Sequence, residues 1–305
     1  MHAGAILAGL VLTSATALSQ VIAISAGTVI YPESGLEERN RTILVEAGKI
    51  KEIGTAVQVP SDAIRVDLSN EIVLPGLIDA HTHLLASVDA KWDLGDFWIM
   101  AVQRRAGYRA IQGARHAKEM LDSGFTTVRD VGNSGDYLDA DLEKAIRFGV
   151  VPGPTMIFSG RIIAPFGGQF WDTPTDGRLL ENPEYRFADS RDEMRKAVRE
   201  NIYWGARVIK IVVDGQKYRY SADDIRFIVD EASRAGVKVA AHVQTERGGA
   251  RGDRGQRSLN RTRLGAYRRG LGSRKKESSR FGEYRFHGGR IGSERNGPCR
   301  RQTDS

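Results

Sequence analysis

Cysteine is almost absent from this sequence, since the 305 residues include only Cys299. A single thiol cannot form an intramolecular disulfide, so a small fold held together by disulfides is excluded, and the cysteine count leaves the cellular compartment open. With this length and 41% hydrophobic residues, the chain can bury one large core or two smaller ones.

A convincing membrane span is also missing. The apolar stretch at residues 1–19 is short, is rich in small residues and ends at Ala17 to Ser19, a pattern typical of a cleavage site. These features favour a secretory signal peptide over a membrane helix, which takes about 20 apolar residues. No charged segment precedes the run, which leaves an N-terminal strand or a wrongly assigned start as alternatives. We expect a secreted or periplasmic protein without membrane contacts.

Charge is distributed unevenly along the chain. The 59 residues after Glu246 hold fifteen arginines and two lysines against five acids, a net charge of +12, whereas residues 1–246 hold 28 basic and 33 acidic side chains, a net charge of −5. The same 59 residues contain no valine, one isoleucine and twelve glycines, so the periodicity of strands and helices ends at Glu246. The body of the chain is therefore mildly acidic and the tail is basic.

Short strands and turns predominate in residues 20–75. Segments 21–30, 42–54 and 63–68 are rich in β-branched residues, and Glu46 to Lys49 has the composition of a hairpin turn. We expect a small β-sandwich-like domain here.

Strands alternate with helices in residues 76–246, which predicts an α/β fold with a parallel sheet or barrel. The expected helices cover residues 101–122 and 138–148 and the two segments that begin with capping boxes at Ser190 and Ser221. The expected strands are the run ending at His83 and residues 125–130, 155–160, 208–213 and 237–243. A loop at residues 164–183, rich in glycine, proline and aromatic residues, is typical of a substrate pocket. These are five βα-type strands in order, which leaves a parallel sheet and a barrel as alternatives.

Two histidines, His81 and His83, end the first of these strands. Side chains two positions apart on a strand share a face, so both imidazoles can bind one ion, and such a pair suits zinc or a similar divalent metal. By itself, an H-x-H pattern is more often two unrelated surface histidines.

Two further residues strengthen this hypothesis. Functional residues of a (β/α)₈ barrel lie at the carboxyl ends of the strands. Lys210 interrupts the apolar strand 208–213, and His242 lies near the end of the next strand. A buried lysine has a lowered pKa, and its neutral amine can react with CO₂ to give a carbamate that bridges two metals. Taken singly, a lysine that reaches solvent and a core histidine are the simpler interpretations.

Together these segments resemble the amidohydrolase superfamily, and most closely its imidazolonepropionase-like and Xaa-Pro dipeptidase-like branch. The matching segments, in chain order, are PGLIDAHTHL, GFTTVRDVGNSG, VPGPTMIFSGRII, GARVIKIVVDG and GVKVAAHVQ. The resemblance covers residues 43–246 and implies a metal-dependent hydrolase with a distorted TIM barrel and a small β-sandwich domain. Because only about five of the eight barrel strands are found, we expect an incomplete TIM-type (β/α) barrel.

The resemblance also implies roles for the candidate residues. His81 and His83 would hold one of two divalent ions, with zinc expected, Lys210 would be the carboxylated bridge, and His242 would hold the second ion. A water held between the metals would attack an amide or peptide bond of a small substrate, such as an Xaa-Pro dipeptide or an N-acyl amino acid. A cyclic-amide hydrolase with the same metal site is an alternative.

Four residues are candidates for substrate binding. Gln169 stands where relatives often have histidine, and its position suggests contact with the substrate. Arg161, Tyr218 and Tyr220 are candidates for binding a substrate carboxylate, from their charge and location.

The family also requires a histidine after the sixth strand and an aspartate after the eighth, which takes the proton from the attacking water. Neither is identified, because His287 has no apolar strand before it, so the catalytic base is unknown. We expect the chain as written to be poorly folded and to have little or no activity.

The tail at residues 247–305 has two interpretations. Its Arg/Gly pairs resemble disordered RNA-binding segments, which would make the chain a barrel remnant with a nucleic-acid-binding arm, although its aromatic residues are few. The alternative is a frameshift, which we favour. Permitted codons read one base further on from Gly249 spell an amphipathic helix, and those of Leu259 to Arg263 spell His-Ser-Thr-Glu-His, which supplies the histidine that the family places next.

Overall fold

The computed structural model describes residues 20–132, 134–169, 176–181 and 183–243. The expected signal peptide (residues 1–19) and the basic tail (residues 247–305) lie outside the described residues, so both stay predictions, as do the domain boundaries. None of the helices in the described ranges is long and apolar enough to cross a membrane.

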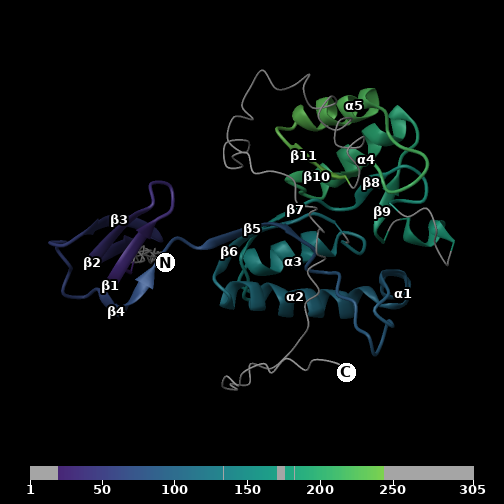
Figure 1. The fold of residues 1–305 in the computed structure, drawn as a ribbon. Helices are drawn as coiled ribbons and strands as arrows, with labels where there is room; N and C mark the ends of the chain where they lie inside the picture. The colour runs from purple at the N-terminus through teal and green to yellow at the C-terminus, as the bar shows by residue number, and fades with distance from the viewer. Residues whose placement is uncertain (1–19, 133, 170–175, 182, 244–305) are drawn as a thin grey trace, which may run out of the picture. The chain divides into compact units, whose positions relative to one another are not determined.

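The N-terminal part is a four-stranded mixed sheet in the order β3-β2-β1-β4 (Figure 1). Its strands are β1 (Ile22–Tyr31), β2 (Leu36–Glu46), β3 (Lys49–Gly54) and β4 (Ile64–Val73). Strand β1 pairs antiparallel with β2 and parallel with β4. The expected hairpin joins β2 to β3 through Ala47 and Gly48, whose φ angles of 52° and 71° suit a two-residue turn with the twist of the strands. Ala26, Val29 and Ile43 form the buried cluster of this sheet.

The rest of the described chain alternates strands with helices, and each strand pair in it is parallel (Figure 1). One sheet has the order β5-β6-β7 and consists of β5 (Leu77–Thr82), β6 (Phe125–Asp130) and β7 (Thr155–Phe158). The other has the order β11-β10-β8-β9 and consists of β8 (Ile162–Ala164), β9 (Tyr185–Phe187), β10 (Val208–Val212) and β11 (Lys238–His242). The predicted α/β class with an incomplete barrel is confirmed.

Helices cover these sheets as βα connections require. Helices α2 (Ala106–Asp122) and α3 (Leu138–Arg147) contact β6 and β7, respectively. Helices α4 (Arg191–Tyr203) and α5 (Ala222–Ser233) pack against the second sheet, and both begin with the predicted capping box. In each box the serine side chain accepts the backbone N–H of the acidic residue three positions on, and that acidic side chain accepts the N–H of the serine.

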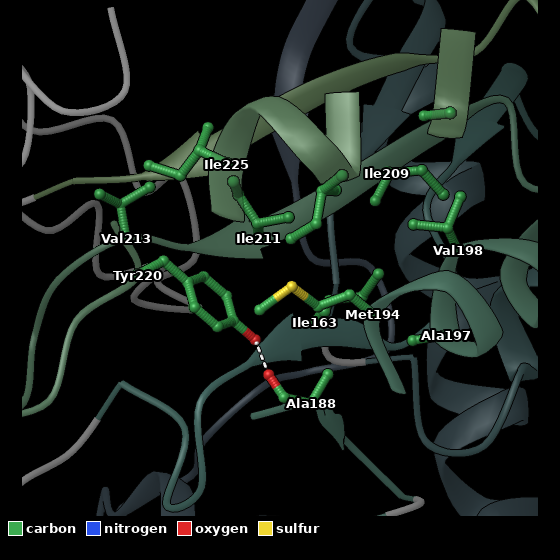
Figure 2. Close-up of a cluster of buried hydrophobic side chains, with 12 residues drawn as sticks. Ile163, Ala188, Met194, Ala197, Val198, Ile209, Ile211, Val213, Tyr220 and Ile225 are labelled. Atoms are coloured by element: carbon green, nitrogen blue, oxygen red, sulfur yellow. Dashed lines mark hydrogen bonds between the residues drawn. The ribbon is translucent and has the colours of Figure 1, made fainter. Parts of the chain in front are cut away.

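Strand β10 is buried on both faces, which is the usual environment of a parallel strand. Ile209, Ile211 and Val213 pack with side chains of α4 and α5 (Figure 2). Val212 points the other way and joins a separate cluster that includes Ile162. Because alternate residues share a face, Lys210 lies on the Val212 side, away from these helices.

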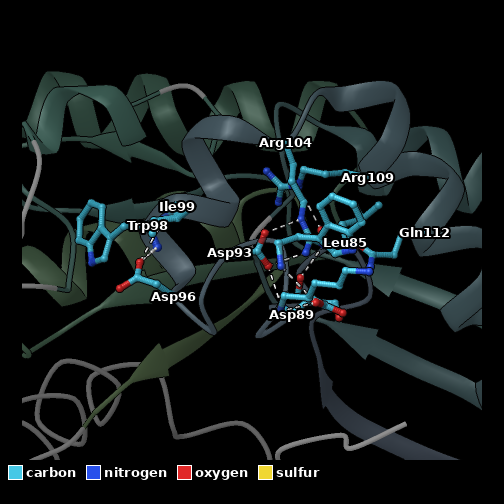
Figure 3. A network of polar contacts seen from close by, with 12 residues as sticks. Leu85, Asp89, Asp93, Asp96, Trp98, Ile99, Arg104, Arg109 and Gln112 are labelled. Carbon is cyan, nitrogen blue, oxygen red and sulfur yellow. Dashed lines mark hydrogen bonds and ion pairs between the residues drawn. The ribbon is translucent and has the colours of Figure 1, made fainter.

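The prediction of a helix over residues 101–122 is confirmed from Ala106 to Asp122 and is wrong at its start, where the helix is interrupted. The structure has α1 (Phe97–Gln103) and α2, separated by Arg104 in an extended conformation with φ −79° and ψ 125°. The Arg104 guanidinium donates to the Asp93 carboxylate, to the Ser87 carbonyl at 2.8 Å and to Gln112 Oε1 at 2.9 Å (Figure 3). The helix breaks there because the arginine is bound to the preceding loop, a contact that residue periodicity does not reveal.

The structure also adds two strands that the sequence analysis missed. Strands β8 and β9 have three residues each, flank the loop at residues 164–183 and are almost fully buried. Three residues are too few to show a period, so the pattern gave no signal. Within the loop, a single 3₁₀ turn covers Gly177–Leu180.

Candidate functional site

His81 and His83 lie at the carboxyl end of β5, where the apolar strand gives way to a loop. Their ring centroids are 5.2 Å apart and the ring planes meet at 66°. His81 is exposed and His83 is partly buried. The two imidazoles are therefore neighbours, as the alternation of side chains along a strand predicts.

The tautomer of His83 follows from its hydrogen bond. Nδ1 lies 3.1 Å from the carbonyl oxygen of Gly132. A carbonyl oxygen only accepts, so Nδ1 of His83 carries the proton and the lone pair of the neutral ring is on Nε2. Burial is the main cause that lowers the pKa of His83 to about 4, so this imidazole is neutral at pH 7. A neutral ring with an available Nε2 is the form that binds a metal.

Among the lysines of the described residues, Lys210 is the one that is buried, with 3% of its surface exposed. Burial, with a smaller contribution from the positive charge of Arg129, lowers its pKa to about 8. The Lys210 amine forms no hydrogen bond or ion pair with the residues that the structure describes. A buried, unpaired ammonium destabilises a fold, so this environment favours the neutral amine that carboxylation requires.

His242 lies on the neighbouring strand, on the same face as Lys210. In the register of β10 and β11, Lys210 is opposite Ala240 and Val212 is opposite His242, so Lys210 and His242 are two positions apart along the sheet. Nε2 of His242 is buried and has no hydrogen-bond partner among the described residues. A buried nitrogen of this kind costs about 1–3 kcal/mol, which a bound ligand would recover.

The positive charge of Lys210 acts on all three imidazoles. Burial is the larger cause in each case, and the nearby lysine further lowers the pKa of His81, His83 and His242. The structure therefore brings the four predicted metal ligands into one neighbourhood.

The donors of this neighbourhood fit divalent metal. Within the described part of the chain, no group of three or more His, Cys, Asp or Glu side chains is arranged to hold one ion. His81, His83 and His242 alone therefore do not form a three-ligand centre, and a site here depends on Lys210 as a further donor. The assignment of these four residues as ligands stays a prediction.

The predicted substrate residues are more scattered. Arg161 is buried, forms ion pairs with Asp136 and with Glu200 at 3.1 Å, and lies 4.7 Å above the ring of Tyr137. Its charge is thus already paired within the fold, although its buried Nε has no partner among the described residues. A substrate carboxylate would have to compete with these acids.

Tyr218, Tyr220 and Gln169 differ in accessibility. Tyr220 is fully buried and its hydroxyl donates to the Ala188 carbonyl at 2.7 Å, so this group supports the core (Figure 2). Tyr218 is exposed. Gln169 borders the loop after β10, because a Cβ atom built on Gly215 would lie 2.5 Å from the Gln169 carbonyl oxygen. Gln169 therefore lies beside the loop between β10 and α5, which itself contains Tyr218 and Tyr220.

Sequence reasoning missed Asp130, the last residue of β6. It is fully buried, and its Oδ2 accepts the backbone N–H of Leu84 at 2.6 Å and the Thr82 hydroxyl at 3.3 Å. Burial raises the pKa of its carboxyl well above the usual value. Its strand also contains Thr126, Thr127 and Arg129, so Asp130 does not stand out as a polar residue on an apolar strand in the way that Lys210 does.

Comparison with known proteins places these residues in a familiar family. Residues 72–266 match the model of the amidohydrolase family, a range that runs past Glu246 into the tail. Ochratoxinase from Aspergillus niger is 28% identical over 259 residues, which cover 75% of this chain and 52% of that enzyme. A dihydroorotase from Geobacter metallireducens is 49% identical over 61 residues, 20% of this chain and 14% of that one.

Solved structures give the same result. A prolidase complexed with N-methylphosphonate-L-proline is 31% identical and superposes with a TM-score of 0.66 over 77% of this chain and 59% of that chain. The crystal structure of A. niger ochratoxinase is 25% identical and superposes with a TM-score of 0.67 over 78% of this chain and 58% of that chain. The chain thus spans little more than half the length of these relatives.

Proposed function

Because the chain belongs to the amidohydrolase family, we propose that it is built as a metal-dependent hydrolase of amide or peptide bonds in small substrates. The observation that supports this proposal is the proximity of four candidate metal ligands: His81 and His83 at the end of β5, Lys210 in the middle of β10 and His242 at the end of β11.

We assign two divalent ions to this site, with zinc as the expected metal. His81 and His83 would hold one ion, His242 the other, and Lys210 would bridge them as a carbamate. Bound metal would supply a Lewis acid and a water of lowered pKa. His83 supplies an imidazole that is neutral at pH 7, and burial also lowers the pKa of His81 and His242. The pKa of Lys210 is about 8, so a fraction of its amine is uncharged and can bond to CO₂ with loss of a proton.

The substrate class that we propose is dipeptides, such as Xaa-Pro, and N-acyl amino acids. Support comes from the prolidase and ochratoxinase neighbours and from a Xaa-Pro dipeptidase with bound methionine, which is 27% identical with a TM-score of 0.66 over 77% of this chain and 60% of that chain. Gln169 is the residue that we place nearest the substrate. The base that accepts the proton of the attacking water is not assigned among the described residues.

We further propose that the protein is exported, and that a frameshift after Glu246 impairs the chain as written. Sequencing the DNA that encodes Arg247 to Ala250 tests the second point. One inserted or missing base is expected, whereas intact bases without an alternative open frame would favour the basic arm.

Hydrolysis tests the proposed function itself. We would assay a panel of Xaa-Pro dipeptides and N-acyl amino acids with the chain as written and with a version whose frame is restored after Glu246. The restored chain should hydrolyse members of the panel, lose activity with a chelator and regain it with zinc, while the chain as written should show little activity. His83→Ala should abolish the activity. His116→Gln is the matched control, since that histidine is not a proposed ligand and the glutamine amide can still donate to the Leu84 carbonyl that His116 contacts from α2. Activity of the restored chain that survives chelation would contradict the proposal.

A further inference from the structure

The three residues that end β6 and follow it, Asp130 to Gly132, hold the His83 segment at four points. The Asp130 carboxylate accepts the Leu84 N–H at 2.6 Å and the Thr82 hydroxyl at 3.3 Å. The Val131 N–H donates to the Thr82 carbonyl at 3.0 Å. The Gly132 carbonyl accepts Nδ1–H of His83 at 3.1 Å. The residues on both sides of His83, and its ring, are therefore fixed by one neighbouring segment.

Gly132 can serve in this way only as glycine. Its φ angle is +121°, a conformation that other residues rarely adopt, and a Cβ atom would lie 2.5 Å from Cγ1 of Ile162. A side chain would displace the backbone and with it the carbonyl that sets the His83 tautomer.

Asp130 is costly to the fold in its own right. Its side chain is fully buried, and its second oxygen, Oδ1, has no partner among the described residues. No arginine, lysine or histidine is recorded as an ion-pair partner of this carboxylate among the described residues. An apolar side chain of similar size would destabilise the buried site less. The presence of an aspartate here is therefore explained by the two donors that its carboxylate binds, the Leu84 N–H and the Thr82 hydroxyl.

We propose that Asp130 is a positioning residue for His83: its carboxylate fixes the backbone at Thr82 and Leu84 so that the His83 ring donates Nδ1–H to Gly132 and presents Nε2 to a metal. The inference deepens the proposed function, on which its metal-binding half rests. Groups that orient a ligand in this way typically change metal affinity by about 10- to 100-fold when they are removed.

Asp139 provides the matched control. It is also a fully buried carboxylate that accepts backbone N–H groups, from Gly160 at 2.8 Å and from Ala140 at 2.9 Å, but it makes no hydrogen bond to the His83 segment. Asp139→Ala therefore removes a comparable buried group without releasing Leu84 or Thr82.

The first measurement is made without metal. In protein labelled with ¹⁵N-histidine, NMR should show the His83 ring protonated at Nδ1 in the wild type and in Asp139→Ala, and averaged between the two tautomers in Asp130→Ala. Asp130→Asn should keep the wild-type signal, because its amide oxygen can still accept from Leu84 and Thr82. If Asp130→Ala does not fold, Thr82→Val, which removes one donor, serves instead and should show partial averaging.

The second measurement is titration with Co²⁺, followed by visible absorption. Asp130→Ala should bind Co²⁺ about 10- to 100-fold more weakly than the wild type and with an altered spectrum, whereas Asp130→Asn and Asp139→Ala should match the wild type. Equal effects of Asp130→Ala and Asp139→Ala, or an unchanged His83 tautomer in Asp130→Ala, would overturn the inference. A wild-type chain that binds no Co²⁺ would refute the proposed function instead, and the NMR result would still decide the positioning role.

Discussion

At the scale of single residues, Asp139 should make stability depend on pH. Burial raises the pKa of its carboxyl to about 7, despite its hydrogen bonds from backbone N–H groups. Because the folded protein holds this proton more tightly than the unfolded chain, the contribution is greatest below pH 4 and is lost as pH rises towards 7.

This gives a measurable difference between two proteins. The free energy of unfolding in urea should fall between pH 5 and pH 8 in the wild type, and Asp139→Asn should remove roughly 2 to 3 kcal/mol of that fall. Asp130→Asn cannot replace Asp139→Asn in this comparison, since it also touches the His83 segment. The same fall in both the wild type and Asp139→Asn would show that Asp139 is not the group that titrates.

The residues that could be predicted are those with a local signal. The spacing of His81 and His83 indicates a ligand pair, and Lys210 and His242 are recognised because each is a polar residue in an apolar strand. The roles of Asp130 and Gly132 could not be predicted, because they depend on which loop lies beside β6. The acids that pair with Arg161, and with which a substrate carboxylate would compete, are also distant in sequence, since Glu200 is on α4.

At the scale of elements, the break between α1 and α2 depends on Arg104. The ion pair of Arg104 with Asp93 is buried, with 9% and 3% of the two side chains exposed. Arg104→Ala would leave the Asp93 carboxylate buried without its partner, which should lower the free energy of unfolding by roughly 3 to 5 kcal/mol. Amide hydrogen exchange should rise in the loop before α1.

Arg115→Ala on α2 is the control for this prediction. Arg115 also pairs with an acid, Glu119, but 70% and 54% of these side chains are exposed, and exposed pairs contribute little. Denaturation of both variants should show a large loss of unfolding free energy for Arg104→Ala and almost none for Arg115→Ala. Equal losses would mean that the buried pair does not hold the loop.

Strand β10 yields a second prediction at this scale. Its five residues are all buried, so Lys210 is a polar group in an apolar strand. Lys210→Met should leave the free energy of unfolding of the metal-free protein unchanged or higher, because the lysine amine has no partner in the part of the chain that the structure describes. The same variant should bind less zinc. A strongly destabilised Lys210→Met would show that the lysine supports the fold and not the site.

The elements that sequence predicted best are those with explicit end signals. The capping boxes at Ser190 and Ser221 placed the starts of α4 and α5, and Ala47-Gly48 placed the β2–β3 hairpin. Strands β8 and β9 were not predicted, because they are defined by their pairing with neighbouring strands and have no recognisable residue pattern.

At the scale of the whole molecule, the order of the motifs predicted the family, and the family model confirms it. The described strands of the matching region form two parallel sheets. Strands β5 and β11 each end a sheet and pair with one neighbour among the described strands. The relatives that match are almost twice as long as the matched segment, so the remaining ligands of the family would come from sequence that this chain does not match.

Zinc content tests most directly whether His81, His83, Lys210 and His242 hold divalent metal together. We would dialyse the folded wild-type chain and its variants against zinc and measure metal per chain by elemental analysis. We expect up to two ions in the wild type and in His116→Gln, and a loss in His81→Ala/His83→Ala and in His242→Ala. A wild-type chain without zinc, or variants that retain all of the zinc, would contradict the assignment of these four residues as metal ligands.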